Sequence, residues 1–355
     1  VNQRAEGVSV MRVLLDLEQY HRMGSHCLTT CLVTLFRQQG IGMPEEMSLG
    51  LGSGLGFTYV RQKGGFMYGG RGGNLEQNLA SSLGLELVAN RTQDKDIAWE
   101  YNRQMLLGCH PLICEVDMAH LPYMVEKLKT NGSGFSGHKL ILIGFDDEKN
   151  ETYVLDYLWN DVVVVNTDDF KKAASSSIKP MSPDNSSLWM QIPKELYPME
   201  YAIHSAIGVN VNQMKNPVGF GLGLKAIKRF YKELRSWPDI LQEDTLRYEL
   251  NMAHLVFEKV GTGGGNFRRM YARFLKNSAT LLQNEQLLEA SKTYTELGKL
   301  WKTVAYDLHE ASVEEKLLDH KIFSRNYETG EQIMKLENQG IQQLERYLEG
   351  GRTCY

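Results

Sequence analysis

Cysteine is scarce in this chain of 355 residues, and its positions do not suggest a stabilising role. The five cysteines are an odd number at irregular spacings, and no C-x-x-C pair occurs among positions 27, 31, 109, 114 and 354. Neither a disulfide framework nor a structural zinc site is therefore expected. We expect a cytoplasmic protein whose thiols are mostly buried, and no metal site.

Long apolar runs and a strong charge of either sign are also missing. No run approaches the roughly 20 apolar residues of a membrane-spanning helix, and the first residues lack the apolar block of a signal peptide. The formal net charge is -4, which gives no basic face for nucleic acid. We therefore expect no membrane and no nucleic acid among the partners of this chain.

The length and pattern of the chain predict two domains. A chain of 355 residues exceeds what one hydrophobic core usually organises. Strand and helix signals mix up to about residue 175, a stretch rich in Ser, Pro and Asn follows, and helical periodicity dominates beyond residue 219. We predict an α+β domain at 1–175, a linker or crossover with an extra strand at 176–218, and a helical domain at 219–355.

A cysteine lies at the predicted start of a helix over residues 25–36. Ser25 can serve as its N-cap, and residues 28, 31, 32 and 35 form one apolar stripe. Cys27 then lies at the positive end of the helix dipole, where unpaired backbone N–H groups favour the thiolate. The alternative is a buried, inert cysteine, and this is the interpretation that the stripe favours for Cys31.

A histidine and a carboxylate downstream complete a candidate catalytic set. His138 opens the apolar strand 138–145, and Asp156 closes the next strand of a predicted hairpin. A cysteine, a histidine base and an orienting acid form the arrangement that activates a nucleophilic thiol. An odd-numbered loop would place Asp156 on the face of His138 and an even-numbered one on the opposite face, so the spacing leaves this acid open.

Two glycine-rich stretches are candidates for ligand binding. Gly54 and Gly56 belong to a run with glycine at every second position, which can bind an anion through backbone N–H groups or form a tight turn. Arg268 follows the glycines of 261–265, where a helix start could hold a phosphate or carboxylate, or where two helices could simply meet at a corner. The loop carboxylate Asp117 could contact an amine, with plain solvation as the alternative.

The motifs resemble the butirosin-pathway acyltransferase family over nearly the whole chain. In the N-terminal half the resemblance rests on His26-Cys27 to Leu35, Gly40, Glu45-Glu46, Gly50 to Phe57, Asp117, Leu121-Pro122-Tyr123, Gly137-His138 and Asp156. In the C-terminal half it rests on the block from Glu258 to Leu275. The resemblance implies a papain-like fold related to C39 peptidases, followed by a helical domain.

The resemblance also implies a reaction and assigns roles to residues. A cysteine nucleophile, Cys27, a base, His138, and an orienting acid, Asp156, would move an acyl or aminoacyl group from a carrier-protein thioester to an amine. Tyr123 joins the candidate substrate-binding residues. C39 peptidases place a Gln shortly before the cysteine, whereas here Gln19 is eight residues away, which puts a side-chain oxyanion donor in doubt.

The expected partners follow from this reaction. They are an acyl carrier protein and a small-molecule amine such as a polyamine or aminoglycoside, with a homodimer also allowed. No cofactor is expected beyond the phosphopantetheine arm of the donor. The competing hypotheses are a C39-like cysteine peptidase or amidase, in which water attacks the acyl-cysteine, and a non-catalytic scaffold that keeps the fold.

Overall fold

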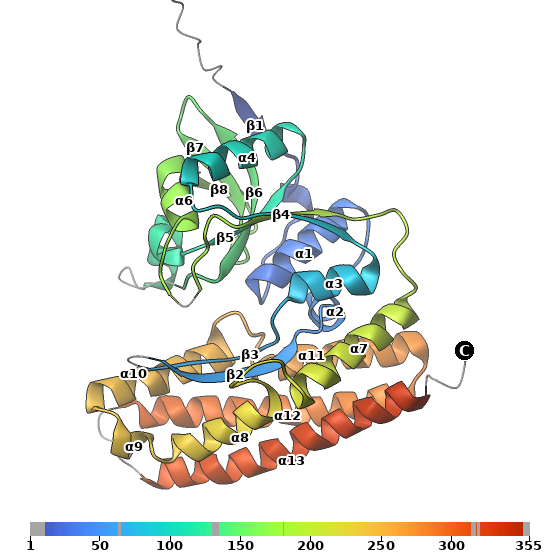
Figure 1. The fold of residues 1–355 in the computed structure, drawn as a ribbon, viewed down its shortest axis with the longest axis vertical. Coiled ribbons are helices and arrows are strands. Elements are labelled where there is room, and N and C mark those ends of the chain that lie inside the picture. The colour runs from blue at the N-terminus through green and yellow to red at the C-terminus, as the bar shows by residue number, and fades with distance from the viewer. Residues whose placement is uncertain are drawn as a thin grey trace, which may run out of the picture. The chain divides into compact units, whose positions relative to one another are not determined.

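The computed structural model describes residues 11–62, 65–129, 135–179, 181–313, 317 and 320–350. Contacts divide the chain into two compact units (Figure 1). Unit 1 comprises 1–43 and 86–192, and unit 2 comprises 44–85 and 193–355. This division differs from the predicted boundaries because 44–85 packs with the helical part, where α2 (Glu45–Leu51) contacts α11 (Arg268–Leu282).

Unit 1 is built on one seven-stranded sheet in which all paired strands are antiparallel. The strand order is β4-β9-β5-β6-β7-β8, and β1 pairs with β6. The strands are β1 (Arg12–Leu14), β4 (Glu86–Asn90), β5 (Leu112–Val116), β6 (His138–Asp146), β7 (Glu151–Leu155), β8 (Val163–Asn166) and β9 (Ser187–Gln191).

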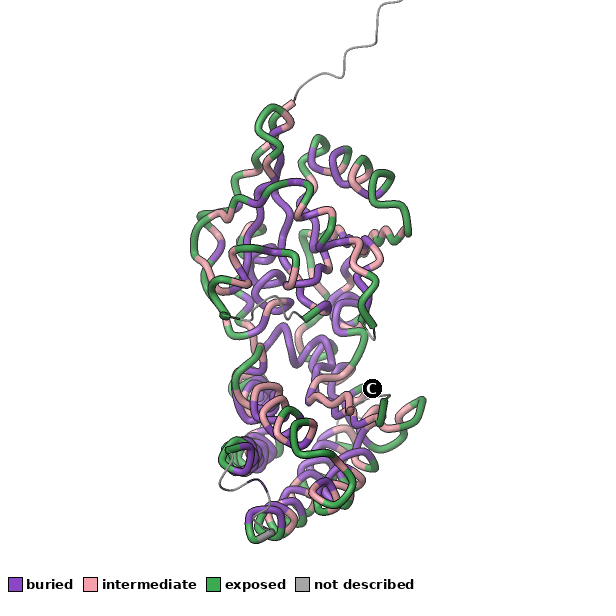
Figure 2. The backbone as a smooth tube through the Cα atoms, turned by 90° about the vertical axis from the view of Figure 1, so that its left-hand side faces the viewer, coloured by how far each residue is buried: buried purple, intermediate pink, exposed green. Residues whose placement is uncertain are grey.

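Helices of both types accompany this sheet. They are the 3-10 helices η1 (Glu18–Tyr20) and η2 (Met118–His120), and the α-helices α1 (Cys27–Gln38), α4 (Lys95–Leu107), α5 (Pro122–Leu128) and α6 (Thr167–Ala174). Helix α1 contacts β6, while α4 and α6 contact β5. Most residues of α1 and of β6 are buried, and Figure 2 shows buried backbone in purple in the interior of the sheet unit. The combination of helices with an antiparallel sheet confirms the predicted α+β class.

A β-bulge in the β6–β7 hairpin determines which residues share a face. The turn 147–150 has four residues, so a regular register would place Asp156 on the face opposite to His138. The register shifts at Ile143, which is an extra residue on β6. Because this extra residue changes the parity, Asp156 follows β7 at the level of Leu140 and on the same face as His138.

The bulge lies where one edge of β6 changes its neighbour. Strand β5 pairs with residues 138–142 and β1 with residues 144–146. The N–H of Leu15 donates to the carbonyl of Ile143 at 2.9 Å, so the bulged residue keeps a backbone partner. A Cβ at Gly144 would lie 2.2 Å from the carbonyl oxygen of Val13. Glycine at 144 therefore permits the close approach of β1.

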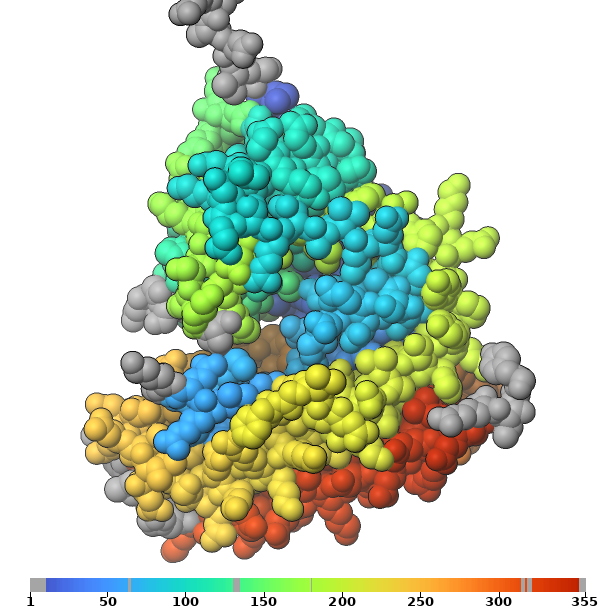
Figure 3. Space-filling view, viewed as in Figure 1, coloured from blue at the N-terminus to red at the C-terminus, as the bar shows by residue number. Residues whose placement is uncertain are grey.

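Unit 2 is mainly helical and contains one two-stranded sheet, β2 (Leu55–Gln62) with β3 (Gly65–Arg71). Besides α2 and α11, its helices are α3 (Leu75–Leu83), α7 (Met199–Lys215), α8 (Gly223–Leu234), α9 (Trp237–Ile240), α10 (Glu243–His254), the π-helix η3 (Leu255–Lys259), α12 (Glu285–Ala311) and α13 (His320–Gly350). Helix α13 packs against α12 and α8, and Figure 3 shows α8 in yellow beside α13 in red.

Aromatic side chains join the hairpin of unit 2 to its helices. The ring centroid of Phe57 on β2 lies 5.3 Å from that of Trp301 on α12 and 5.9 Å from that of Phe230 on α8. Phe66 on β3 stacks on Trp237 at 4.7 Å. These apolar contacts explain why the glycine-rich runs, which the sequence predicts as loops, contain a strand pair.

The segment 176–218, predicted as a linker with an extra strand, contains more regular structure than its composition suggests. Strand β9 joins the sheet of unit 1, and the 17-residue helix α7 belongs to unit 2. Helix α7 buries Ile203, Ile207 and Met214, which share one of its faces. This apolar stripe is what stabilises a helix in a segment that begins with several breaker residues.

Candidate active site

Helix α1 begins at Cys27, and its N-cap is His26 rather than the predicted Ser25. His26 has an extended backbone, and its Nδ1 accepts a hydrogen bond from the N–H of Thr29 at 3.3 Å. The imidazole nitrogen thus replaces the side-chain oxygen that usually caps a helix. Cys27 is only partly buried, whereas residues 28–36 are all buried. The thiol therefore lies in the first turn, at the positive end of the helix dipole.

The bulged hairpin brings the predicted histidine and carboxylate together. Nε2 of His138 lies 2.8 Å from Oδ2 and 3.0 Å from Oδ1 of Asp156. The side chains of both residues are almost completely buried, at 2% and 0% exposed. A buried carboxylate at this distance fixes both the orientation of the ring and the nitrogen that carries the proton.

Asp156 receives two further hydrogen bonds. The hydroxyl of Tyr123 donates to Oδ2 at 2.7 Å, and the backbone N–H of Tyr157 donates to Oδ1 at 2.7 Å. Together with His138, three donors surround the carboxylate. Burial of an ionised carboxylate is costly unless such donors replace water, so this set allows Asp156 to stay charged inside the unit.

The pKa of His138 reflects this environment. Burial lowers the pKa, but the charge of Asp156, the hydrogen bond to it and a hydrogen bond with Cys27 outweigh burial and raise the pKa to about 10. Because Nε2 faces Asp156, Nδ1 is the ring nitrogen left for Cys27. His138 is therefore an imidazolium near neutral pH, between a carboxylate and a thiol that it can stabilise as thiolate.

The raised pKa of His138 has a consequence for stability. A histidine with an unfolded pKa near 6.5 binds its proton more tightly in the folded state, so its stabilisation is complete below about pH 6.5. It is lost as the pH rises through about 10. We expect the free energy of unfolding, measured with urea between pH 6 and 10, to fall with pH more steeply in the wild type than in Asp156→Asn. Parallel curves for the two proteins would contradict this assignment.

Tyr123 was predicted to bind substrate, and its hydroxyl instead contacts the acid. Its ring packs edge-on against Trp159 at 4.9 Å, and burial followed by the Asp156 charge raises the pKa of its hydroxyl well above the usual value. The hydroxyl is therefore a neutral donor to Asp156. Substrate binding by the ring stays a prediction.

Removing this hydroxyl should destabilise the unit. We expect Tyr123→Phe to lower the free energy of unfolding by about 1.5–3 kcal/mol, because a hydrogen bond to a buried charge is lost. Tyr153→Phe is the matched control, since its hydroxyl donates to the partly exposed Glu151 at 3.0 Å. Chemical denaturation of both variants checks the difference, and an equal loss in the two would show that Asp156 does not depend on Tyr123.

His21 is a site residue that sequence reasoning missed. It is 1% exposed, and its Nε2 lies 3.1 Å from the carbonyl oxygen of Asp156 and 3.0 Å from that of Trp159. Its Nδ1 lies 2.9 Å from the hydroxyl of Thr34 on α1. No periodic pattern marks this position. The resemblance pointed to this region only because C39 peptidases carry a Gln shortly before the cysteine, and Gln19 bonds Asp16 here.

Tyr157 and Cys31 complete the surroundings of the thiol. The Tyr157 ring lies 5.6 Å from that of His138, and burial, then the charges of Cys27 and Asp156, raises the pKa of its hydroxyl. Cys31 is buried, as the helical stripe predicts, and burial raises the pKa of its thiol well above the usual value. Cys31 is therefore a neutral packing residue behind Cys27.

Asp117, the second predicted substrate-binding residue of unit 1, has both carboxylate oxygens engaged. It is 2% exposed, its Oδ1 accepts the N–H of Ala119 at 3.0 Å, and its Oδ2 accepts the hydroxyl of Ser176 at 2.7 Å. These bonds cap η2 and tie the segment after α6 to it. An amine contact would require one of them to open, so that role stays a prediction.

The remaining predicted substrate-binding residues belong to unit 2. Gly54 and Gly56 flank the start of β2 and are buried. Arg268 is fully buried, with Nε 2.8 Å from Glu337, while its Nη1 donates to the carbonyl of Gly70 at 3.1 Å and to two further carbonyls. In this conformation Arg268 ties α11 to α13 and the hairpin. Binding of a substrate anion by Arg268 would require these contacts to break.

The glycine loop 261–265 holds a carboxylate that belongs to the chain itself. The N–H of Gly265 donates to Glu258 at 2.7 Å, and Arg269 lies 3.4 Å from the same carboxylate. An anion-binding loop and a helix corner were the two predicted alternatives for this block. The loop combines them, because Glu258 accepts the N–H of Gly265 at the corner, while the N–H groups of Gly264 and Asn266 bond Thr262 and the carbonyl of Phe257.

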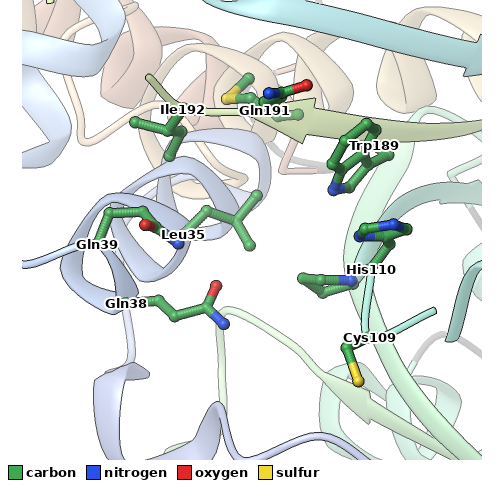
Figure 4. A pocket seen from close by; sticks show the side chains of 10 residues that line it. Leu35, Gln38, Gln39, Cys109, His110, Trp189, Gln191 and Ile192 are labelled. Atoms are coloured by element: carbon green, nitrogen blue, oxygen red, sulfur yellow. The ribbon is translucent and has the colours of Figure 1, made fainter. Parts of the chain in front are cut away.

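A shallow pocket of about 170 Å³ lies at the other end of α1 (Figure 4). It is lined by Leu35, Gln38, Gln39, Cys109, His110, Pro111, Trp189, Met190, Gln191 and Ile192. The rings of His110 and Trp189 pack at 4.4 Å on one side of it. Since a 12-residue helix is roughly 18 Å long, this pocket is separate from the Cys27 thiol.

Several absences hold for the part of the chain that the structure describes. No group of three or more His, Cys, Asp and Glu side chains there is arranged to hold a metal ion. None of its helices combines the length and apolar character of a membrane span. None of its four cysteines forms a disulfide bond, and Cys354 lies outside the described residues.

Cys27, His138 and Asp156 thus define a candidate site of the nucleophilic-cysteine class. Residues 26–157, which contain all three, match the family described as butirosin biosynthesis protein H, N-terminal. The resemblance predicted from the motifs is thereby confirmed. Residues 168–344 match a domain of unknown function, DUF4872. A search of curated proteins finds no significant match.

Proposed function

We propose that this protein is a cysteine-dependent acyltransferase that moves an acyl or aminoacyl group from a carrier-protein thioester, through an acyl-Cys27, to an amine such as a polyamine or an aminoglycoside. The observation that carries the proposal is the partly exposed thiol at a helix start beside the buried His138–Asp156 pair. The family description supports a role in butirosin-type antibiotic biosynthesis.

The chemistry follows from the charges of the three side chains. The Cys27 thiolate attacks the thioester carbonyl carbon, and backbone N–H groups at the start of α1 stabilise the oxyanion. The C–S bond to the phosphopantetheine arm breaks, and the imidazolium of His138 protonates the departing sulfur. An amine then attacks the acyl-Cys27, His138 accepts its proton, and the Cys27 thiolate leaves as the amide forms. Asp156 keeps the imidazole in one orientation throughout.

A papain-like fold is part of this proposal. Support comes from a helix that begins with cysteine and packs on the strand that begins with histidine. The same site would serve a C39-like peptidase or amidase if water, rather than an amine, attacked the acyl-Cys27. The decisive difference is therefore the acceptor, and the experiment must offer both.

Intact mass spectrometry tests the proposal. After incubation with short acyl thioesters we expect one acyl group on the wild type and none on Cys27→Ala, with discharge by a polyamine at least about tenfold faster than by water. Cys109→Ser is the matched control, because Cys109 is the exposed cysteine of unit 1 and should not be needed.

The other outcomes are equally informative. An adduct that persists in Cys27→Ala and disappears in Cys109→Ser would move the nucleophile to Cys109. Discharge at the same rate with and without amine would identify a hydrolase. An unmodified wild type with every thioester would favour the non-catalytic scaffold.

A further inference from the structure

Three large apolar side chains are exposed on the two segments that meet at Gly137, the residue before the candidate base. Phe135 is 42% exposed, Ile178 48% and Met181 37%. Gly137, which directly precedes His138, packs against two of them, since a Cβ at this position would lie 2.8 Å from the Phe135 ring and 3.2 Å from the Met181 sulfur. We call Phe135, Ile178 and Met181 the apolar rim.

Hydrogen bonds hold the backbone of two rim residues, Phe135 and Ile178. The N–H of Met118 donates to the carbonyl of Phe135 at 3.2 Å. The hydroxyl of Ser182, which is 6% exposed, donates to the carbonyl of Ile178 at 3.0 Å. The carboxylate of Asp117 accepts a hydrogen bond from the hydroxyl of Ser176, at the start of the segment that carries Ile178 and Met181. The backbone of Phe135 and of Ile178 is thus hydrogen-bonded to neighbouring segments, and Asp117 ties the segment that carries Ile178 to η2.

The rim continues the site on the side of the base. His138 is itself buried and bonds Cys27, and one glycine without a side chain separates it from the rim. An acyl chain attached to the Cys27 sulfur and directed past His138 would meet the apolar rim, which offers apolar carbon atoms and the polarisable sulfur of Met181. An exposed apolar surface that adjoins a site is typical of a ligand-binding surface.

We propose that the apolar rim is an acyl-chain subsite, which binds the hydrocarbon part of the donor while its carbonyl lies at Cys27. The inference rests on the proposed function and narrows its donor to thioesters with an apolar acyl chain. Each methylene that the rim removes from water should improve the reaction roughly fourfold. The terminal charge of a short acidic or aminoacyl group would gain nothing there.

A chain-length series tests the subsite. We expect kcat/KM for transfer to spermidine to be at least about tenfold higher with an octanoyl than with an acetyl N-acetylcysteamine thioester. Phe135→Ala and Met181→Ala should each lower this octanoyl-to-acetyl ratio about fivefold to tenfold, and Phe135→Leu should restore most of it. Val164→Ala, which shortens an exposed side chain on β8, should keep the wild-type ratio.

The outcomes separate the subsite from the reaction. Equal kcat/KM values for acetyl and octanoyl donors, with acyl-Cys27 formed from both, would overturn the subsite and leave the acyltransferase intact. A Phe135→Ala defect that appears only with carrier-protein donors would make the rim a protein-docking surface and overturn the subsite. A wild type that no thioester acylates would overturn the acyltransferase and the subsite with it.

Discussion

A carboxylate keeps its charge inside a protein only when hydrogen-bond donors replace the water it has lost, and much of unit 1 is arranged to meet this requirement at Asp156. Its three donors come from different parts of the chain: the β6 ring of His138, the hydroxyl of Tyr123 on α5, and the N–H of the next residue. The charge that these donors stabilise keeps the imidazole protonated, and the imidazolium in turn favours a thiolate on Cys27.

The helix that begins with Cys27 also helps to hold Asp156. At its start, His26 caps α1 and Cys27 follows. Two turns further on, Thr34 contacts His21, whose other nitrogen contacts the carbonyl of Asp156. Two histidines before α1 thus serve the site in different ways. His26 caps the first turn of the helix, and His21 links the helix to the residue that follows β7. Burial lowers the pKa of His21, which disfavours a charged ring at this link.

The sequence predicts what depends on local pattern and misses what depends on packing at a distance. The helix start at Cys27, the strand at His138 and most helices of unit 2 follow from periodicity. The face on which Asp156 lies does not, because it depends on a bulge. Gly144 beside the bulge is only a general sign of a bulge or of a close backbone approach, and the even turn alone would predict the wrong face. The burial of Arg268 against Glu337 could not be predicted from the sequence either. A glycine-rich corner with arginines is expected to be exposed, and the helix that covers it is distant in the sequence.

The bulge also limits where the hairpin can vary in length. One residue added to or removed from a paired strand between the bulge and Asp156 would turn the acid to the other side of the sheet, whereas a change of two residues would keep it beside the histidine. Loss of the extra residue at Ile143 would turn the acid in the same way. A residue added in the turn 147–150 leaves Asp146 paired with Glu151 and the face of Asp156 unchanged, so the turn can vary as loops ordinarily do. Changes in length are therefore restricted by parity in the strands of this hairpin and not in its turn.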